Sequence, residues 1–210
     1  SAMSLEARQL VDWIVLTGDH GGAPFIVVDK KRASVLVFEA DARLLAQSAV
    51  LLGSALGDHS VPGIGTRPMD RILPSERTTP AGRFVAERGR NTQGEDVVWV
   101  DYDAAVSMHR VRTAHPAEQR AHRLATPDIG DNRISYGCIN VPVAFFDHVI
   151  RPIFALRTAM VYVLPDARPV EEVFGIPHTA TTRHGGDDAG PTLVQGVNRV
   201  SAQRITSRRR

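Results

Sequence analysis

The chain has 210 residues, of which 43% are hydrophobic and 23% charged, as in ordinary soluble globular proteins. Its apolar runs are all shorter than the roughly 18 residues that a membrane-spanning helix needs, so no transmembrane segment is expected. The formal net charge is +2, but six arginines and only two acidic residues lie in residues 175–210. Without these, the totals of 25 basic and 23 acidic residues fall to 19 and 21, so the body is slightly acidic and a nucleic-acid-binding function is disfavoured.

Residues 4–20 form the first predicted element, an N-terminal helix. Apolar residues recur at helical spacing from Leu5 to about Thr17. Ser4 is suited to cap the start of this helix, and Gly18 is suited to end it. The pattern therefore predicts one helix before the first strand.

Short runs rich in Val, Ile and Phe follow this helix and are separated by turn residues. Strands are expected at residues 24–28, 33–38, 83–87, 96–101, 104–111 and 160–164. Residues 44–56 fit either a strand followed by a loop or a short helix, and residues 57–81 predict a long loop rich in Gly and Pro. Many short strands and few helices predict a mainly β fold.

Two later segments complete the expected organisation. Residues 113–133 are polar and irregular, and residues 142–156 have the apolar spacing of a helix that Pro152 ends or kinks. Beyond Pro177 the chain is rich in Thr, Gly, Asp and Arg and has almost no aromatic residues. This composition predicts a disordered basic tail over residues 177–210.

Cys138 is the only cysteine of the chain, which rules out an intrachain disulfide and a zinc site built from thiolates. Gly137 precedes it, and the helical pattern of residues 142–156 begins shortly after it. We therefore expect the amides of Gly137 and Cys138 to lie near a helix N-terminus, where they would stabilise an oxyanion and favour a thiolate. The alternative is a buried structural cysteine in a corner between a loop and a helix.

The sequence around this cysteine resembles a known catalytic signature. The segment from Ser135 to Asn140 (Ser-Tyr-Gly-Cys-Ile-Asn) is similar to the Ser-x-Gly-Cys signature of the L,D-transpeptidases of the YkuD type. Residues 79–84 (Thr-Pro-Ala-Gly-Arg-Phe) match the Thr-Pro-x-Gly-x-Phe element of that family, and residues 27–38 resemble its opening hairpin. The resemblance covers residues 23–165 and implies a mixed β-sandwich catalytic domain with a few peripheral helices.

A thiol nucleophile needs a base, and the family uses a histidine at a strand edge that a backbone carbonyl orients. His122 lies 16 positions before Cys138, but in a polar stretch without strand character. His109 lies 29 positions before it and ends a predicted strand, on which Ser107 and His109 share one face. Because a strand holds an imidazole more rigidly than a loop does, we expect His109 to be the base, oriented by the carbonyl of Arg110.

The other candidate residues each have two interpretations. Ser135, Tyr136, Asn140 and Arg133 are candidates for contact with a substrate. Ser135 instead fits a role in shaping the turn by hydrogen bonding, and Asn140, which stands where many relatives carry Arg, also fits a helix cap. Arg133 and Tyr136 equally fit a solvated surface.

The resemblance implies a cysteine transpeptidase of the cell wall. In that family, the thiolate attacks a peptidoglycan tetrapeptide stem after its third residue, terminal D-alanine leaves, and an amine resolves the acyl-enzyme without a metal or other cofactor. The implied partners are stem peptides or an envelope protein as acyl acceptor, and the implied location is the periplasm or cell envelope. Residues 57–81 and 112–133 are expected to wall the cleft.

Two alternatives remain open from the sequence. One is a murein hydrolase or carboxypeptidase that uses the same Cys/His pair. The other is a non-catalytic murein-binding domain of the envelope.

Overall fold

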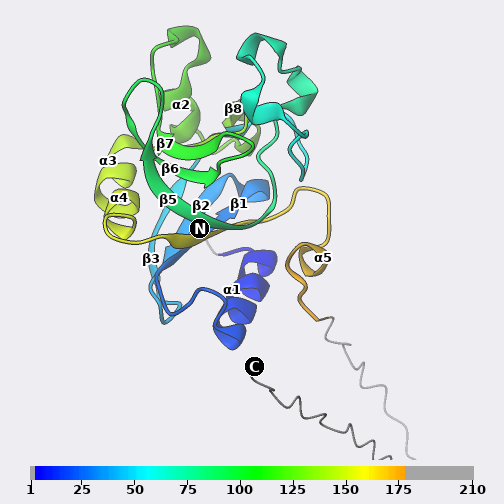
Figure 1. Cartoon of the computed structure of the whole chain (residues 1–210), viewed down its shortest axis with the longest axis vertical. Helices are drawn as coiled ribbons and strands as arrows, with labels where there is room; N and C mark the ends of the chain where they lie inside the picture. The colour runs from blue at the N-terminus through cyan, green and yellow to red at the C-terminus, as the bar shows by residue number, and fades with distance from the viewer. Residues whose placement is uncertain (1–2, 178–210) are drawn as a thin grey trace, which may run out of the picture. The chain divides into compact units, whose positions relative to one another are not determined.

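The computed structural model describes residues 3–177, which form an eight-stranded mixed β-sheet, a two-stranded sheet and short helices (Figure 1). The strand order in the large sheet is β3-β2-β1-β10-β5-β6-β7-β9. Its strands are β1 (Phe25–Asp29), β2 (Ser34–Phe38), β3 (Leu44–Ala49), β5 (Gly82–Arg90), β6 (Asp96–Asp101), β7 (Val106–Arg110), β9 (Ile139–Val141) and β10 (Ala159–Val163). The β1–β10 and β7–β9 pairs are parallel and the other neighbours antiparallel. The predicted mainly β fold is confirmed, while the predicted tail lies outside the described residues from His178 onward.

The helices are short, except for α1. They are α1 (Leu5–Thr17), α2 (Arg120–Ala125), α3 (Val143–Phe145), α4 (Arg151–Ile153) and α5 (Val170–Phe174). The predicted ends of α1 are confirmed, because the Ser4 hydroxyl accepts a hydrogen bond from the Ala7 amide and Gly18 adopts φ 68°. Among residues 3–177, no helix is both long and apolar enough to cross a membrane.

The predicted helix of residues 142–156 runs from α3 to α4 through a π-helical turn, η7 (Phe146–Ile150). In this turn the Arg151 amide donates to the carbonyl of Phe146, five residues back. The wide turn lies directly before Pro152, which has no amide hydrogen for a regular helix. The helix ends at Ile153, one residue after the proline, as its position predicted.

Segments predicted as irregular contain single turns of 310 helix. The long loop of residues 57–81 holds η2 (Ile64–Thr66), η3 (Met69–Arg71) and η4 (Pro74–Glu76). The turn after β1 is η1 (Lys30–Arg32), and the polar segment around α2 contains η5 (Pro116–Glu118) and η6 (Ile129–Asn132). Figure 1 shows both long segments at the end of the sheet opposite α1.

Two hydrophobic cores lie on opposite faces of the sheet. Strand β1 is buried along its whole length because its alternate side chains enter different cores. Ile26 and Val28 join the larger core, which also contains residues of β2, β6, β7, β9 and η7. Phe25 and Val27 join the second core, which α1 and α5 cover.

The segment of residues 44–56, for which the sequence left a strand and a helix open, contains strands. It connects β3, at one edge of the large sheet, to β9, at the other edge. After β3, Leu51 exchanges two backbone hydrogen bonds of 2.9 Å with Asn140 of β9. The next residues form β4 (Leu52–Gly53), which pairs in parallel with β8 (Arg133–Ser135). The seam between β4, β8 and β9 therefore lies directly beside Cys138.

A lysine in the turn after β1 is completely buried. The Lys30 ammonium donates hydrogen bonds to the carbonyls of Gly57 (2.6 Å) and Thr79 (2.8 Å). It also forms ion pairs with Asp58 at 3.0 Å and Asp166 at 3.2 Å. A buried ammonium is tolerated only where acceptors replace its hydration, so these contacts bind three distant segments to the β1–β2 turn.

The carboxylate of Asp58 is held equally tightly. Burial by itself would raise the pKa of this group, but hydrogen bonds from the amides of Arg168, Asp166 and Ala167 and from Lys30 outweigh burial and hold the pKa far below its usual range. The group is thus ionised in the folded protein. Its stabilising contribution is present above the pKa of an unfolded aspartate, about 3.9, and is lost as the pH falls below that value.

The two lysines of the chain make a matched test of this network. Lys30→Met leaves two buried carboxylates with less compensation, and we expect it to lower the free energy of unfolding by about 3–5 kcal/mol. Lys31→Met removes an ion pair between Lys31 and Glu6 in which the lysine side chain is 44% exposed, and we expect a change below about 1 kcal/mol. Urea denaturation measures both, and equal losses would contradict the assigned role of Lys30.

Candidate active site

The register of β7 and β9 brings His109 and Cys138 to one face of the sheet. In this parallel pair Met108 lies opposite Ile139 and His109 lies opposite Asn140. Met108 and Ile139 are fully buried in the larger core. Since side chains alternate along a strand, His109 and Asn140 face away from that core, and Cys138 immediately precedes β9.

The sulfur of Cys138 contacts one serine through two groups. The backbone amide of Ser107 donates to Sγ at 3.5 Å, and the Ser107 hydroxyl lies 3.7 Å from Sγ. The thiol itself points to the carbonyl of Ala105 at 3.7 Å. Ser107 is buried and Cys138 is half-buried, so the sulfur lies in a partly desolvated position with fixed donors.

His109 is buried and its ring is fixed by the backbone. Nδ1 lies 2.7 Å from the carbonyl of Arg110, the contact predicted from the sequence. A carbonyl only accepts hydrogen bonds, so Nδ1 carries the hydrogen in the neutral ring and Nε2 is the nitrogen that can take a proton. His122, the other candidate base, is exposed on the short helix α2.

The environment of the thiol favours its ionised form. Burial raises the pKa of Cys138, but the interaction with the His109 side chain, followed by the two Ser107 contacts, outweighs burial. The net pKa lies below the usual range of a thiol. Ser107 is therefore part of this site, although the sequence showed only that it shares a face with His109.

The Ser107 hydroxyl can be tested separately from His109. Ser107→Ala removes one contact to the sulfur, so we expect the thiolate to form at higher pH and alkylation by iodoacetamide at neutral pH to slow by about threefold. Ultraviolet absorbance of the thiolate against pH measures the first effect, with Cys138→Ser as the blank. The exposed Ser75 supplies the control, Ser75→Ala. An unchanged titration midpoint in Ser107→Ala would exclude this role.

The loop before Cys138 differs from the prediction. Cys138 is followed by strand β9, and helix α3 begins only at Val143, so no helix N-terminus lies at the thiol. The Gly137 amide is also occupied, because it donates to the Ser135 hydroxyl at 3.1 Å. The prediction that both amides lie at a helix N-terminus is therefore wrong, and only the Cys138 amide remains as a candidate oxyanion donor.

Ser135 forms hydrogen bonds within the loop of residues 135–138 that carries the cysteine, the nucleophile loop. Its buried hydroxyl donates to the Cys138 carbonyl at 2.6 Å while it accepts the bond from Gly137. Both bonds lie within four residues of chain. The geometry therefore fits the shaping of the turn rather than contact with a substrate.

Thr79 connects this loop to the buried lysine. The Thr79 hydroxyl donates to the Gly137 carbonyl at 2.8 Å, and the Thr79 carbonyl accepts from Lys30. Gly137 has φ 132°, and a Cβ at this position would lie 2.7 Å from the carbonyl oxygen of Thr78. Only glycine fits at this close approach to the backbone of Thr78. The bond from Thr79 gives the Thr-Pro element of residues 79–84 a structural role next to the thiol.

Gly137→Ala tests this close approach. We expect it to lower the free energy of unfolding by about 1–3 kcal/mol, because the added methyl group meets backbone, and to slow alkylation of Cys138 by at least about tenfold. Gly94→Ala is the matched control, since Gly94 also has positive φ but a methyl group added there would have no atom within 4 Å. Unfolding curves and alkylation rates that are the same for both variants would contradict the account.

The three other residues predicted to contact a substrate, Asn140, Tyr136 and Arg133, each contact other groups of the protein. Asn140 is fully buried and belongs to β9, so the predicted helix cap is wrong; its side chain donates to the Cys138 carbonyl at 3.2 Å. The Tyr136 ring lies beneath the Arg77 guanidinium, 4.0 Å from the ring centre. Arg133 lies in β8, where it pairs with Asp166 at 2.7 Å and donates to the Lys30 carbonyl, so it belongs to the buried ion network.

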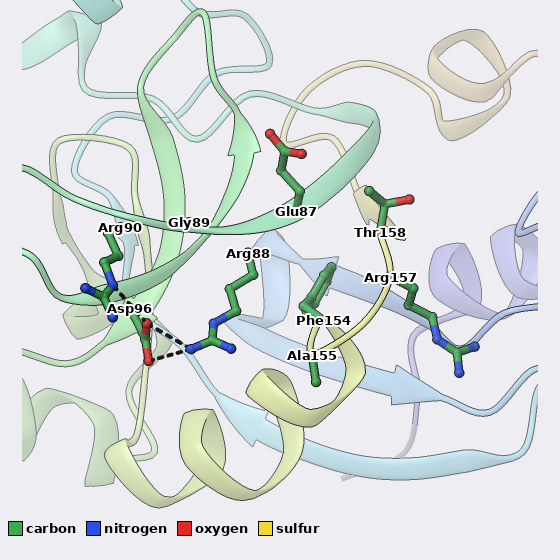
Figure 2. A pocket seen from close by; sticks show the side chains of 9 residues that line it. All are labelled: Glu87, Arg88, Gly89, Arg90, Asp96, Phe154, Ala155, Arg157 and Thr158. Carbon is green, nitrogen blue, oxygen red and sulfur yellow. Dashed lines mark hydrogen bonds and ion pairs between the residues drawn. The ribbon is translucent and has the colours of Figure 1, made fainter.

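A cavity of about 570 Å³ lies elsewhere, between β5, the start of β6 and residues 154–158 (Figure 2). Arg88 and Arg90 in its wall are both paired with Asp96. Its lining includes none of the residues that contact Cys138. We therefore do not assign it to the chemistry of the thiol.

No protein-family model and no curated protein matches the chain. Solved structures do match it. The structures that this chain resembles include L,D-transpeptidases. They include the L,D-transpeptidase LdtMt1 in complex with imipenem, at 17% identity over 68% of this chain and 59% of that chain, with a TM-score of 0.39.

Two further matches are similarly distant. The L,D-transpeptidase from Mycobacterium smegmatis is 15% identical over 67% of this chain and 58% of that chain, with a TM-score of 0.39. The helical cell shape determining protein Pgp2 from Campylobacter jejuni is 13% identical over 76% of this chain and 57% of that chain, with a TM-score of 0.45. The chain thus spans less than two thirds of these proteins. All three TM-scores are below 0.5, and the roles of Cys138 and His109 depend on the geometry described above.

Proposed function

We propose that the protein is a cysteine acyltransferase that acts on the stem peptides of peptidoglycan. The observation that carries the proposal is that the β7–β9 register places His109 and Cys138 on one face of the sheet, where the Arg110 carbonyl leaves Nε2 as the proton acceptor and the thiol pKa is lowered. The Ser-Tyr-Gly-Cys signature supports the choice of substrate. Such a pair is the arrangement that nucleophilic catalysis by a thiol requires.

The first half-reaction forms an acyl-enzyme. His109 Nε2 takes the thiol proton, and Sγ of Cys138 bonds to the carbonyl carbon of the third residue of the stem. The C–N bond to terminal D-alanine then breaks, and the proton on His109 passes to the leaving amine. The product is a thioester at Cys138 with free D-alanine.

The second half-reaction reverses these steps with another amine. The acceptor nitrogen bonds to the thioester carbonyl, His109 takes its proton, and the C–S bond breaks to regenerate the thiol. The acceptor is an amine of another stem or of an envelope protein. This chemistry uses no cofactor and takes place where murein is found, in the periplasm or cell envelope.

The tetrahedral intermediate carries a negative oxygen that needs a donor. The Cys138 amide fits this role, since the Gly137 amide is occupied by Ser135. The bonds from Ser135 and Asn140 to the Cys138 carbonyl hold the peptide unit that follows the nucleophile. The donor and the nucleophile are thus positioned by the same loop.

Incubation with purified tetrapeptide muropeptides, read by mass spectrometry, tests the proposal. We expect crosslinked dimers and released D-alanine from the wild-type protein and neither from Cys138→Ala. Shortened monomers without dimers would indicate hydrolysis instead of transfer. Full activity of Cys138→Ala would contradict the proposal.

Histidine variants separate the two candidate bases. His109→Ala is expected to lower the rate by about 10²–10⁴-fold because it removes the proton acceptor. His122→Ala is expected to lower it far less, and the exposed His148 supplies a control variant, His148→Ala, at the wild-type rate. A fully active His109→Ala together with an inactive His122→Ala would assign the base to His122.

A further inference from the structure

A second cavity has Arg120 in its wall, and hydrogen bonds connect this arginine to the candidate active site. It has a volume of about 440 Å³ and is formed by η5, the start of α2 and the residues just before them. Arg120, His115 and His122 line it, and within the part of the chain that the structure describes its lining includes no aspartate or glutamate. The lining therefore offers one guanidinium and two imidazoles, and the carboxylate of Glu118, which is outside the lining, pairs with Arg120.

Hydrogen bonds connect this wall to the nucleophile. The Arg120 guanidinium donates from Nη1 to the Asn140 side-chain oxygen at 2.7 Å. The side-chain nitrogen of Asn140 in turn donates to the Cys138 carbonyl at 3.2 Å, and Asn140 lies opposite His109 in the β7–β9 pair. Arg120 is thus separated from the Cys138 peptide unit by one buried side chain.

The Arg120 guanidinium has N–H groups that neither Glu118 nor Asn140 uses, and it already stabilises the carboxylate of Glu118. Its Nε donates to Glu118 at 2.6 Å, so the bonds to Glu118 and Asn140 use two of the five N–H groups that a guanidinium carries. The hydrogen bond from Arg120, followed by the charges of Arg120, His115 and Arg123, holds the pKa of Glu118 below its usual range. Arg120 therefore already stabilises one ionised carboxylate in this segment.

We propose that this cavity is a subsite for a carboxylate of the molecule that reacts at Cys138, with Arg120 as its main ligand. A planar guanidinium recognises a carboxylate through paired N–H donors, which a lysine would not reproduce. If the proposed function holds, the ligand is a free carboxylate of the stem peptide close to the bond that is cut. The inference rests on the proposed function for that substrate only, since the subsite itself has a test that needs no peptide.

Two small alkylating reagents provide this test. Iodoacetate carries a carboxylate and iodoacetamide is neutral, and both modify the single cysteine, so intact mass reports Cys138 alone. We expect the ratio of the iodoacetate rate to the iodoacetamide rate to be higher in the folded protein than in the urea-unfolded chain. Because the attraction is electrostatic, the ratio is expected to fall as the salt concentration rises.

Arg120→Gln should lower this ratio by about fivefold, and Arg120→Lys should restore part of it. The matched control is Arg123→Gln, which removes a charge from the same helix but lies outside the cavity lining. The neutral reagent reports any change in the thiol itself, so the ratio isolates recognition of the carboxylate. An unchanged ratio in Arg120→Gln, or an equal fall in Arg123→Gln, would overturn the proposal.

The two proposals fail in different ways. If the muropeptide assay shows no acyl transfer while the ratio of the two alkylation rates still depends on Arg120, the subsite proposal is supported and the proposed substrate is wrong. If transfer occurs and the ratio of the iodoacetate rate to the iodoacetamide rate does not depend on Arg120, the proposed function is supported and the subsite proposal is wrong. Stem peptides with the carboxylate converted to an amide then provide the direct comparison, with a rise in KM expected in the wild type and not in Arg120→Gln.

Discussion

The buried ammonium of Lys30 is the constraint on which the position of the nucleophile depends. It binds the carbonyl of Thr79, whose hydroxyl donates to Gly137, the residue directly before Cys138. The network is electrically balanced, because Lys30 and Arg133 face Asp58 and Asp166. Since an unpaired charge in this place would be costly, the segments that supply its partners have little freedom to move.

The positions of the residues at the site depend on the pairing of β7 with β9. The β7–β9 register places His109 opposite Asn140, two residues after Cys138. The backbone bonds between Leu51 and Asn140 hold the other edge of β9. Two long segments then contact the nucleophile loop through arginines, Arg77 on the Tyr136 ring and Arg120 on Asn140. The expectation that residues 57–81 and 112–133 wall a cleft at the thiol stays a prediction.

Local patterns in the sequence predicted much of the fold, because they act over a few residues. The helix of residues 5–17, the hairpin of β1 and β2, and the alternation of β7 depend on periodicity and caps alone. The Cys138 segment was also found from local sequence. Helix α5 was missed because five residues give too short a pattern, and its position depends on packing over the second core.

Features that depend on distant residues were not predicted. Lys30 belongs to an Asp-Lys-Lys stretch that is typical of an exposed turn, and its partners at residues 57, 58, 79 and 166 are far away in sequence. The same holds for the bond between Arg120 and Asn140, twenty positions apart. The helix expected next to Cys138 was wrong because pairing with β7 makes residues 139–141 a strand first.

The central claim is that Cys138 is an activated nucleophile that accepts an acyl group. Intact mass after exposure to a carbapenem tests it most directly, because the strained carbonyl of the drug acylates a reactive thiol and the adduct is stable enough to weigh. The account predicts a single addition of the drug mass, located at Cys138 and strongly reduced in His109→Ala. An unmodified mass under conditions in which a known L,D-transpeptidase is acylated would contradict it.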